Sequence, residues 1–500
     1  MPNTTATRVY PLSEPGDSVI RLRVQALGLN RADIRWLANP HIETPKLPAR
    51  IGYEVAGVVE AVGAGLTGYR PADRVTSLLC KQARLPVMLM LLALLAGYAD
   101  RAAAQATAQP FAKPEVVRPS RVDIDQKRID AILQRVRTAR LPREMPAMSA
   151  EKAAWETGAD IQWLKGLRQY WTKQFDWRAA EVRLNRYPQY KARVDGVAIH
   201  FYYVKGEGSN PLPLLLTHGW PGSVVEFLDV IGPLTQPSKH GGRAEDAFTV
   251  IIPSLPGFAF SGLPADVSFW NTTARLWQKL VTEVIGHERY VAQGGDAGSE
   301  ITVLLAYHYP RSVKAIHLNL VPWGHIPPDQ QTPEEKVWAT NGDAFMAAEF
   351  DYLRLQVNRP MMPSVALADS PMGTAAWIAE KFYAWSDNHG DLDKTFSKDL
   401  LLTNIMLYLL SENGVEGSFR LYRAIRDELR WTFVPGRIEV PTSVALFPRE
   451  YPMGRPPLET AKRWYNIVRY TPMPRGGHFP ALEQPDLFVT DLRESFRSAR

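Results

Sequence analysis

The sequence has almost no cysteine and no concentration of charge of one sign. Its 500 residues include a single cysteine, Cys80. This count excludes an intrachain disulfide and a cysteine-based metal site, and Cys80 lies in no motif that would make it a nucleophile. Lys and Arg number 58 and Asp and Glu 52, and the two signs are interleaved along the chain. The resulting net charge of +6 carries no sign of a nucleic-acid-binding surface.

The chain also lacks an apolar run long enough to span a membrane. The run VMLMLLALLA, Val87–Ala96, is about half as long as a transmembrane helix needs to be. Lys81 and Arg84 precede it, and small residues follow at 102–104 and 106. This order is typical of a secretory signal, although a buried helix is the alternative. Residues 81–110 are therefore interpreted as a signal-like segment and linker.

The position of this signal-like segment is unusual, because a signal is read at the N-terminus. Either a foreign segment has been fused in front of it by a gene fusion, or the true start of the protein lies downstream. The protein is periplasmic or secreted if the segment is used, and cytoplasmic if translation begins at Met1. The sequence leaves the compartment open between these two.

Residues 1–80 contain β-type runs, chiefly Val19–Ile34 and Ile51–Gly65. The stretches ALGLNRADI, GYEVAGVVEAVG and RPADRV resemble the start of the catalytic domain of medium-chain alcohol dehydrogenases and quinone oxidoreductases. This GroES-like fragment is truncated, because the nicotinamide-binding domain does not follow it, so no hydride chemistry is implied. Tyr53 stands where zinc-dependent members usually have histidine, which argues against a catalytic zinc. A partial β-domain leaves exposed edges, so we expect this part to be poorly ordered or loosely attached.

The stretch GAGLTG, Gly63–Gly68, matches the dinucleotide-binding pattern G-x-G-x-x-G by letter. That pattern indicates a cofactor only where the loop opens a helix whose N-terminus holds the pyrophosphate. Pro71 stands where this helix should be under way. The sequence therefore predicts a β-turn at this place and no bound nucleotide.

The rest of the chain changes its pattern at two places. Residues 111–205 are mainly helical, with two apolar stripes that predict core faces: Ile129, Ile132, Leu133 and Val136, then Ile161, Leu164, Leu167 and Trp171. In 206–326 and 438–500, strand-like runs alternate with helical ones, which indicates a doubly wound, mostly parallel sheet. Residues 327–437 are mainly helical, and we expect them to form a cap over the carboxyl edge of the sheet.

The stretch VAQGGDAGSE, Val291–Glu300, has the outline of a nucleophile elbow, a strand-turn-helix motif that normally presents a serine between two glycines. Asp296 takes the place of the serine, between Gly294 and Gly298. One interpretation is a lost serine in an inactive hydrolase. The other is a carboxylate nucleophile, which would attack an sp³ carbon and form an alkyl ester that water then cleaves. Such chemistry suits epoxides and alkyl halides.

The stretch LTHGWPGS, Leu216–Ser223, follows a strand and suits one half of an oxyanion hole. The backbone N–H of Trp220 would pair with that of Ala297, the residue after the nucleophile position. His218 belongs to this turn, so we interpret it as a turn-stabilising residue and not as the catalytic base.

The base and its acid come late in such a chain, in the order nucleophile, acid, histidine. His478, in PRGGHFPALEQP, is the one histidine that follows the last core strand expected. Glu450, at the end of the preceding strand in SVALFPREYP, would orient the imidazole and stabilise its charged form. The alternatives are a structural histidine and a surface glutamate beside Arg449.

From about Lys113 to its end, the chain resembles the microsomal-type epoxide hydrolases, including their N-terminal helical segment. The stretches that carry the resemblance include LTHGWPGSVVEF, GGDAGSEI, DYLRLQ, FRLYR, FPRE and RGGHFPALEQP. The resemblance implies an α/β-hydrolase fold with a helical cap, and neither a metal nor an organic cofactor. It also implies that Tyr352 and Tyr422 hold and protonate the epoxide oxygen. Ala297 is a departure, because this family often has tryptophan there, and we expect a changed pocket shape.

The sequence thus predicts an epoxide hydrolase that converts a small apolar epoxide and water to a vicinal diol, in detoxification or in aromatic hydrocarbon catabolism. Three alternatives remain open: a haloalkane dehalogenase, an inactive α/β-hydrolase binding module, and an NADP oxidoreductase suggested by residues 1–80 alone. In the dehalogenases a tryptophan directly follows the nucleophile, whereas Ala297 follows it here. The oligomeric state stays open, a homodimer included.

Overall fold

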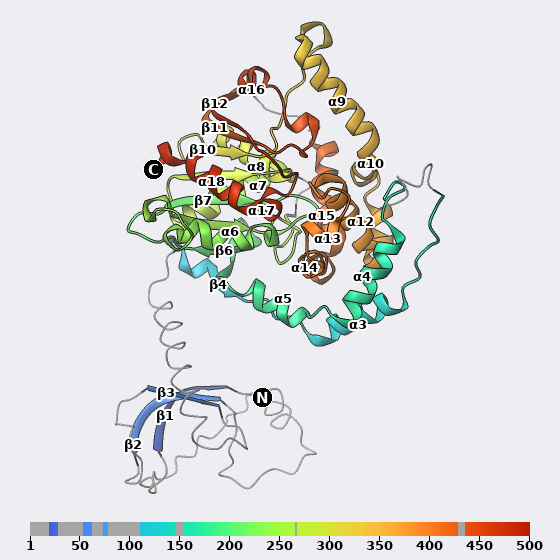
Figure 1. Ribbon diagram of the computed structural model, residues 1–500. Helices are drawn as coiled ribbons and strands as arrows, with labels where there is room; N and C mark the ends of the chain where they lie inside the picture. Colours follow the sequence, from blue (N-terminus) through green and yellow to red (C-terminus); the bar gives the residue numbers. More distant parts are fainter. Residues whose placement is uncertain are drawn as a thin grey trace. The chain divides into compact units, whose positions relative to one another are not determined.

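The computed structural model (Figure 1) describes residues 20–28, 54–62, 74–78, 111–146, 155–265, 268–428 and 436–500. The chain divides into two compact units, Met1–Gln109 and Pro110–Arg500, and each is described by itself. Four features discussed above lie outside the described residues: Cys80, Tyr53, the Gly63–Gly68 turn and the Val87–Ala96 run.

In the first unit, three strands form an antiparallel sheet in the order β1-β2-β3. They span Ile20–Gly28, Glu54–Val62 and Arg74–Leu78. The first two lie within the β-type runs predicted from the sequence. The rest of residues 1–80, and with it the expectation about the order of this part, lies outside the described residues.

The second unit contains a nine-stranded sheet in the order β12-β11-β10-β9-β7-β8-β6-β5-β4. Its six parallel strands are β7 (Leu212–Thr217), β8 (Phe248–Pro253), β9 (Tyr290–Gly294), β10 (Val313–Leu318), β11 (Ile438–Leu446) and β12 (Tyr465–Pro472). Three antiparallel strands complete one edge, β4 (Val117–Ser120), β5 (Gln189–Val194) and β6 (Val197–Val204). The predicted mostly parallel sheet is therefore confirmed.

Helices cover both faces of this sheet (Figure 1). The helices α7 (Trp270–Lys279) and α8 (Ala297–His308) pack against each other, and α8 contacts β7, β9, β10 and β11. The helices α6 (Leu228–Thr235) and α18 (Pro485–Ser495) pack together on the other face. Two shorter helices lie toward the C-terminus of the chain, α16 (Leu458–Trp464) and α17 (Pro480–Glu483).

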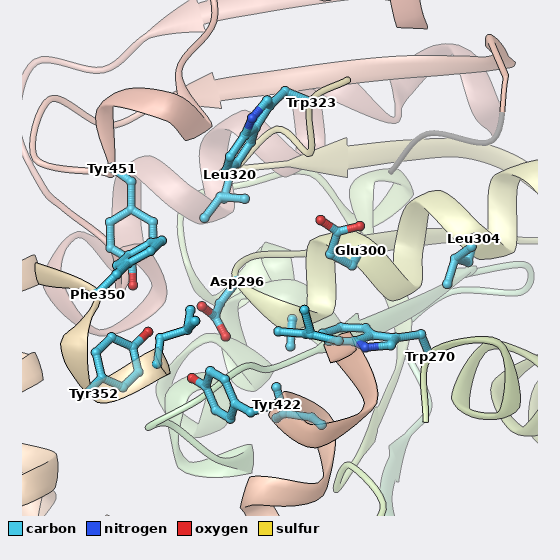
Figure 2. A pocket seen from close by; sticks show the side chains of 14 residues that line it. Trp270, Asp296, Glu300, Leu304, Leu320, Trp323, Phe350, Tyr352, Tyr422 and Tyr451 are labelled. Atoms are coloured by element: carbon cyan, nitrogen blue, oxygen red, sulfur yellow. The ribbon is translucent and has the colours of Figure 1, made fainter. Parts of the chain in front are cut away.

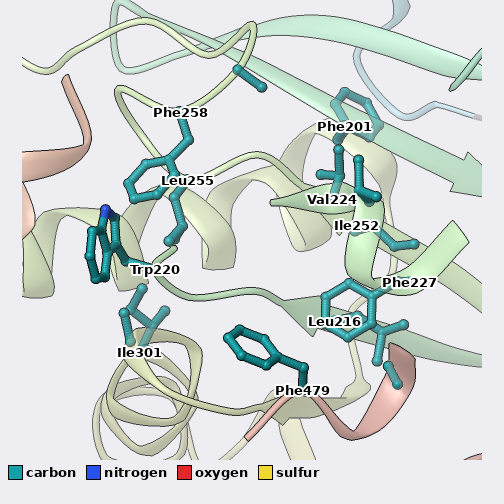
Figure 3. Packing of buried hydrophobic residues seen from close by; sticks show 14 of the residues in the cluster. Phe201, Leu216, Trp220, Val224, Phe227, Ile252, Leu255, Phe258, Ile301 and Phe479 are labelled. Carbon is teal, nitrogen blue, oxygen red and sulfur yellow. The ribbon is translucent and has the colours of Figure 1, made fainter. Parts of the chain in front are cut away.

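The core lies between the sheet and these helices. Every residue of β8 and β9 is buried, as expected for parallel strands that are covered on both faces. Figure 3 shows Leu216 and Ile252 on neighbouring strands near Phe227, and Ile301 near Trp220; all five belong to one buried cluster. This packing holds the turns that follow β7 and β9 in place.

Within residues 327–437, where the sequence predicts a cap, the described residues are mainly helical. The helices are α9 (Pro333–Glu349), α10 (Asp351–Asn358), α11 (Met361–Asp369), α12 (Pro371–Trp385), α13 (Leu392–Thr395), α14 (Lys398–Leu410) and α15 (Gly414–Asp427). The helices α10 and α15 pack against each other. Each carries one of the two tyrosines singled out above, Tyr352 and Tyr422.

The N-terminal helices of this unit pack against the cap. They are α3 (Gln126–Thr138), α4 (Ile161–Lys173) and α5 (Trp177–Leu184), and they contact α12 and α14. Arg128 donates to the backbone oxygen of Leu410 at 2.7 Å, and the Tyr170 hydroxyl donates to Asp399 at 2.9 Å. The apolar stripes predicted for α3 and α4 are buried or partly buried, so this segment braces the cap from outside (Figure 1).

Candidate active site

Asp296 lies in the sharp turn between β9 and α8. Its backbone has a φ of 48°, in the region that L residues rarely adopt and that strained functional turns use. A Cβ at Gly294 would collide with the backbone of Gly298, and one at Gly298 would collide with the backbone of Thr217. Both positions therefore require glycine, and the turn presents the Asp296 side chain at the carboxyl edge of the sheet.

The turn after β7 lies beside Asp296, because Thr217 and Gly294 are paired in the parallel register and both strands end there. The backbone N–H of Trp220 donates to Oδ1 of Asp296 at 2.9 Å. Ala297 is the first residue of α8, so its N–H is one of the amides at the helix start that have no partner within the helix. Of the two residues predicted for the oxyanion hole, Trp220 thus donates to the Asp296 carboxylate and Ala297 directly follows Asp296 at the start of α8.

His218 makes two hydrogen bonds within its own turn. Its Nε2 accepts from the backbone N–H of Leu255 at 3.1 Å, and its Nδ1 lies 3.0 Å from the backbone oxygen of Gly219. Burial lowers the pKa of this imidazole to about 4. His218 is therefore neutral and fully bonded, in agreement with the turn-stabilising role inferred from the sequence.

His478 and Glu450 form a buried pair next to Asp296. Nδ1 of His478 lies 2.8 Å from Oε1 of Glu450, and Nε2 lies 3.4 Å from Oδ2 of Asp296. The backbone N–H of Tyr451 also donates to Glu450 at 2.8 Å. The loop that carries His478 passes close to the backbone of Trp385, and a Cβ at Gly477 would collide with that backbone. Glycine at this position therefore allows His478 to take up its place.

The charges around His478 favour its protonated form. Burial lowers the pKa of the imidazole, but Glu450 and then Asp296 outweigh burial and raise it to about 10. In the unreacted protein, His478 is therefore an imidazolium that bridges two carboxylates. It can become a base only after one of these two charges has been removed.

Tyr352 and Tyr422 face Asp296 from the cap (Figure 2). The Tyr352 ring stacks on Trp220 with centroids 5.0 Å apart, and the Tyr422 ring meets Trp220 edge-on at 5.5 Å. Burial raises the pKa of both phenols well above 10, and the Asp296 carboxylate adds to both shifts. At neutral pH each phenol keeps its proton and can donate it in a hydrogen bond.

These side chains line a cavity of about 110 Å³ beneath the cap. Most of its wall is aromatic or aliphatic; it includes Trp270, Leu304, Leu320, Trp323, Phe350, Leu353, Leu421 and Ile425. The polar groups are concentrated at Asp296 and the tyrosines, with Glu300 one helical turn further along α8. An apolar cavity with a few convergent polar groups is the usual form of a small-molecule site.

Comparisons with known proteins agree with this geometry. Residues 117–227 match the model of the epoxide hydrolase N terminus, and residues 213–390 match that of the alpha/beta hydrolase fold. A Stigmatella aurantiaca protein named "Putative epoxide hydrolase" is 41% identical over 389 residues, covering 77% of this chain and 86% of that protein. The chain belongs to the epoxide hydrolase family.

Two further epoxide hydrolases support the family and the fold. Epoxide hydrolase 1 of Oryctolagus cuniculus is 33% identical, over 76% of this chain and 88% of that protein. The solved structure of Aspergillus niger epoxide hydrolase is 29% identical with a TM-score of 0.66, over 76% of this chain and 96% of that one. Residues 16–111 match the alcohol dehydrogenase GroES-like domain, which supports the fragment recognised at the front of the chain.

Three residues around this epoxide hydrolase site were not predicted from the sequence. Tyr451 stacks on His478, with centroids 4.5 Å apart, and lines the cavity. Glu300 lines the same cavity, and Glu226 lines a smaller cavity that also borders Asp296. Tyr451 directly follows Glu450, and Glu226 belongs to the LTHGWPGSVVEF stretch. Their positions close to predicted site residues are the only feature of the sequence that could have indicated them.

Across the described ranges, no helix is both long and apolar enough for a membrane crossing.

Ala297 provides a direct test of the shape of this cavity. It lines the wall beside Asp296, so an Ala297→Trp side chain would extend into the space that the substrate needs. We expect kcat/KM to fall by about 10-fold or more for bulky epoxides and by much less for small ones, since overfilling a packed site costs about 1–3 kcal/mol. Steady-state kinetics on a series of epoxides of increasing size measures this, and equal losses across the series would contradict it.

Proposed function

We propose that this epoxide hydrolase converts a small apolar epoxide to a vicinal diol through a covalent ester on Asp296. In the first step, the phenols of Tyr352 and Tyr422 donate hydrogen bonds to the epoxide oxygen. Oδ2 of Asp296 attacks one ring carbon, the carbon–oxygen bond of the ring breaks, and a phenol supplies the proton to the leaving oxygen. The phenolate regains a proton from solvent before the next turnover. The apolar cavity wall holds the rest of the substrate.

In the second step, water cleaves the ester. His478 takes a proton from water while Glu450 orients the imidazole and stabilises its charge. The hydroxide oxygen bonds to the ester carbon, and the N–H groups of Trp220 and Ala297 hold the oxyanion that forms. The bond between that carbon and the alkyl oxygen then breaks, and the alkyl oxygen takes the proton of the newly added hydroxyl group. The diol leaves, Asp296 is restored as a carboxylate, and His478 remains protonated as it was at the start.

One observation carries this proposal: a carboxylate in an elbow turn faces two buried phenols that keep their protons. An opening epoxide produces an alkoxide, which needs an acidic O–H donor. A halide leaving group needs N–H donors instead, which favours the epoxide over the haloalkane dehalogenase alternative. A complete set of nucleophile, base, acid and donors argues against an inactive binding module.

The proposed reaction is tested by incubating the protein with a panel of apolar epoxides and with matched haloalkanes. We expect diol from the epoxides and no halide release from the haloalkanes. Halide release without diol formation would favour a dehalogenase, and neither product would favour a binding module. The two product assays are independent, so each alternative has its own result.

The two cap phenols should control ring opening. Tyr352→Phe and Tyr422→Phe are each expected to lower the rate of ester formation by about 10²-fold, the usual range for losing a general acid. The double change should lower it further. Single-turnover rapid-quench measurements follow this step. Tyr383→Phe is a matched control, since that cap tyrosine stacks on Trp155 away from the cavity, and unaffected ester formation in the double variant would remove both phenols from the mechanism.

The two steps should depend on pH differently. Ester formation neutralises Asp296 and so removes one of the two carboxylates that raise the pKa of His478 to about 10. We expect this pKa to fall in the ester. Since hydrolysis needs neutral imidazole, its rate should rise with pH until that lowered pKa is passed, whereas ester formation needs no neutral imidazole. Single-turnover measurements test this from about pH 5 to 8, the range in which histidine commonly titrates, and upward toward the pKa of about 10 in the unreacted protein. A hydrolysis rate that is flat over the whole range would contradict it.

A further inference from the structure

A second, much smaller cavity also borders Asp296 and is separate from the substrate cavity. Its volume is about 10 Å³, close to the ~10–15 Å³ that one water molecule requires. Among the described residues, Asp296 is the only one that lines both cavities. Gly219, Trp220, His478 and Glu226 line the small one, and Gln293 and Asn319 form another part of its wall.

Gln293 and Asn319 offer unused hydrogen-bonding groups in this wall. The Gln293 amide nitrogen donates to Oδ1 of Asn319 at 2.8 Å. Gln293 is 1% and Asn319 3% exposed, and in the described part of the chain neither Oε1 of Gln293 nor Nδ2 of Asn319 has a partner. Exchanging the two amide assignments would also leave one donor and one acceptor unpaired. Buried polar atoms of this kind are commonly satisfied by ordered water.

Glu226 brings a carboxyl group to the same wall. It lies in the short 3-10 helix Val224–Phe227, directly after the turn that carries Trp220. Its side chain folds back over Gly222, where a Cβ would collide with Oε1. Burial raises the pKa of this carboxyl to about 8, with His478 opposing the shift and Asp296 adding to it. At neutral pH the group is therefore mostly protonated. The backbone groups of Gly219 and Ser223 also bond to this carboxyl and oppose the shift, and the O–H of the protonated form is the group that can donate to a water.

We propose that this small cavity binds the water that hydrolyses the Asp296 ester, and that Glu226 is the positioning residue that holds it. The water lies between the Glu226 carboxyl and the imidazole of His478, with the Gln293–Asn319 pair beside it. From there its oxygen bonds to the ester carbon of Asp296, and Nε2 of His478 takes the proton. The bond from that carbon to the alkyl oxygen breaks, the alkyl oxygen takes the proton of the newly added hydroxyl group, and the diol leaves into the substrate cavity.

This arrangement separates the two steps in space. The epoxide reaches Asp296 from the cavity beneath the cap, and water reaches the same carboxylate from the small cavity. Because the bound diol ester fills the substrate cavity, a separate place for water allows hydrolysis before the product has left. Glu226 acts on the second step alone, through the position of the water, and has no part in ring opening.

The inference rests on the ester mechanism proposed above, and Glu226→Met tests it. Methionine has a similar length and no group to hold water strongly. We expect ester hydrolysis to slow by about 10- to 100-fold, as misplacing a reactant by about 1 Å can do, with ester formation within about twofold of wild type. The ester then accumulates, so kcat and KM fall together. Rapid-quench mass spectrometry of the intact protein measures both rate constants.

Asp229→Asn serves as the matched control. Asp229 lies three residues after Glu226, and its carboxylate pairs with Arg183 near the surface at 2.7 Å, away from the small cavity. In Asp229→Asn, the rate constants for ester formation and for ester hydrolysis should both equal those of wild type. A Glu226→Met variant in which hydrolysis is unchanged, or in which both steps slow equally, overturns the water site. Wild-type protein that turns over epoxide without forming an ester overturns the proposed mechanism itself, and the inference with it.

A crystal structure of the wild-type protein gives a second test that does not depend on a variant folding. We expect ordered density for one water within hydrogen-bonding distance of the Glu226 carboxyl and Nε2 of His478. A small cavity that is filled by a rearranged side chain, or that shows no water density, contradicts the assignment.

Discussion

Asp296→Asn is expected to lower kcat by about 10⁴-fold or more, because losing the nucleophile of a covalent hydrolase removes most of its catalysis. Asparagine has the same size as aspartate and also tolerates a positive φ better than most residues, so the turn at 48° should persist. Its amide oxygen can still accept the Trp220 N–H. The change therefore removes the charge and nucleophilicity of one group and little else.

Two measurements on this variant separate chemistry from folding. The melting temperature should stay within a few degrees of wild type, and intact-protein mass spectrometry should detect no adduct with substrate. The residual rate must also be measured on freshly prepared protein, since an amide that hydrolyses restores the wild-type enzyme. A variant that keeps more than about a tenth of the wild-type kcat would exclude Asp296 as the nucleophile, given the size of the loss expected.

His478→Gln is expected to stop the reaction after its first step. Ring opening needs Asp296 and the cap phenols, so ester should still form. Hydrolysis needs the imidazole, so steady-state turnover should fall by about 10³-fold or more, at the upper end of the range for general-base catalysis. Nearly every molecule should then carry a covalent adduct with the mass of one epoxide, which mass spectrometry of the intact protein detects directly.

The control for this variant is His240→Gln. His240 is exposed on the surface and lines neither of the two cavities. This control should turn over normally and show no lasting adduct. If His478→Gln formed no ester at all while remaining folded, the imidazole would be required for ring opening. The assignment of His478 to ester hydrolysis alone would then be wrong.

The residues of the elbow and the histidine loop were accessible from the sequence because local patterns determine them. Gly294 and Gly298 are required by backbone contacts within a few residues of the turn or on the adjacent strand, so the chain must encode them. Asp296, Glu450 and His478 then follow from their order along the chain. What the order does not contain is distance, and only the fold places Nε2 of His478 3.4 Å from Asp296.

The cap tyrosines and Glu226 mark the limit of such inference. Tyr352 and Tyr422 lie on amphipathic helices, where a tyrosine is usually part of the core, and only the resemblance to a family assigned them a role. Their significance depends on how α10 and α15 pack over the sheet. Glu226 stands in a stretch quoted for other reasons, but the burial that raises its pKa to about 8 exists only after folding.

The N-terminal helices show the same contrast. Their apolar stripes predicted buried faces, and Ile129, Ile132 and Val136 are buried. The sequence contained no indication that these helices would pack against the cap, since the contacts to Leu410 and Asp399 join residues more than 200 positions apart. Periodicity identifies which face of a helix is buried, and it does not identify the partner.

The ester on Asp296 is the central claim, and a single turnover in ¹⁸O-labelled water tests it most directly. With enzyme in excess over epoxide, the diol oxygen gained in the first turnover should come from unlabelled Asp296, and the label should appear in the Asp296 carboxylate, where peptide mass spectrometry can find it. Label that enters the first-turnover diol directly, with none in Asp296, would contradict the covalent mechanism.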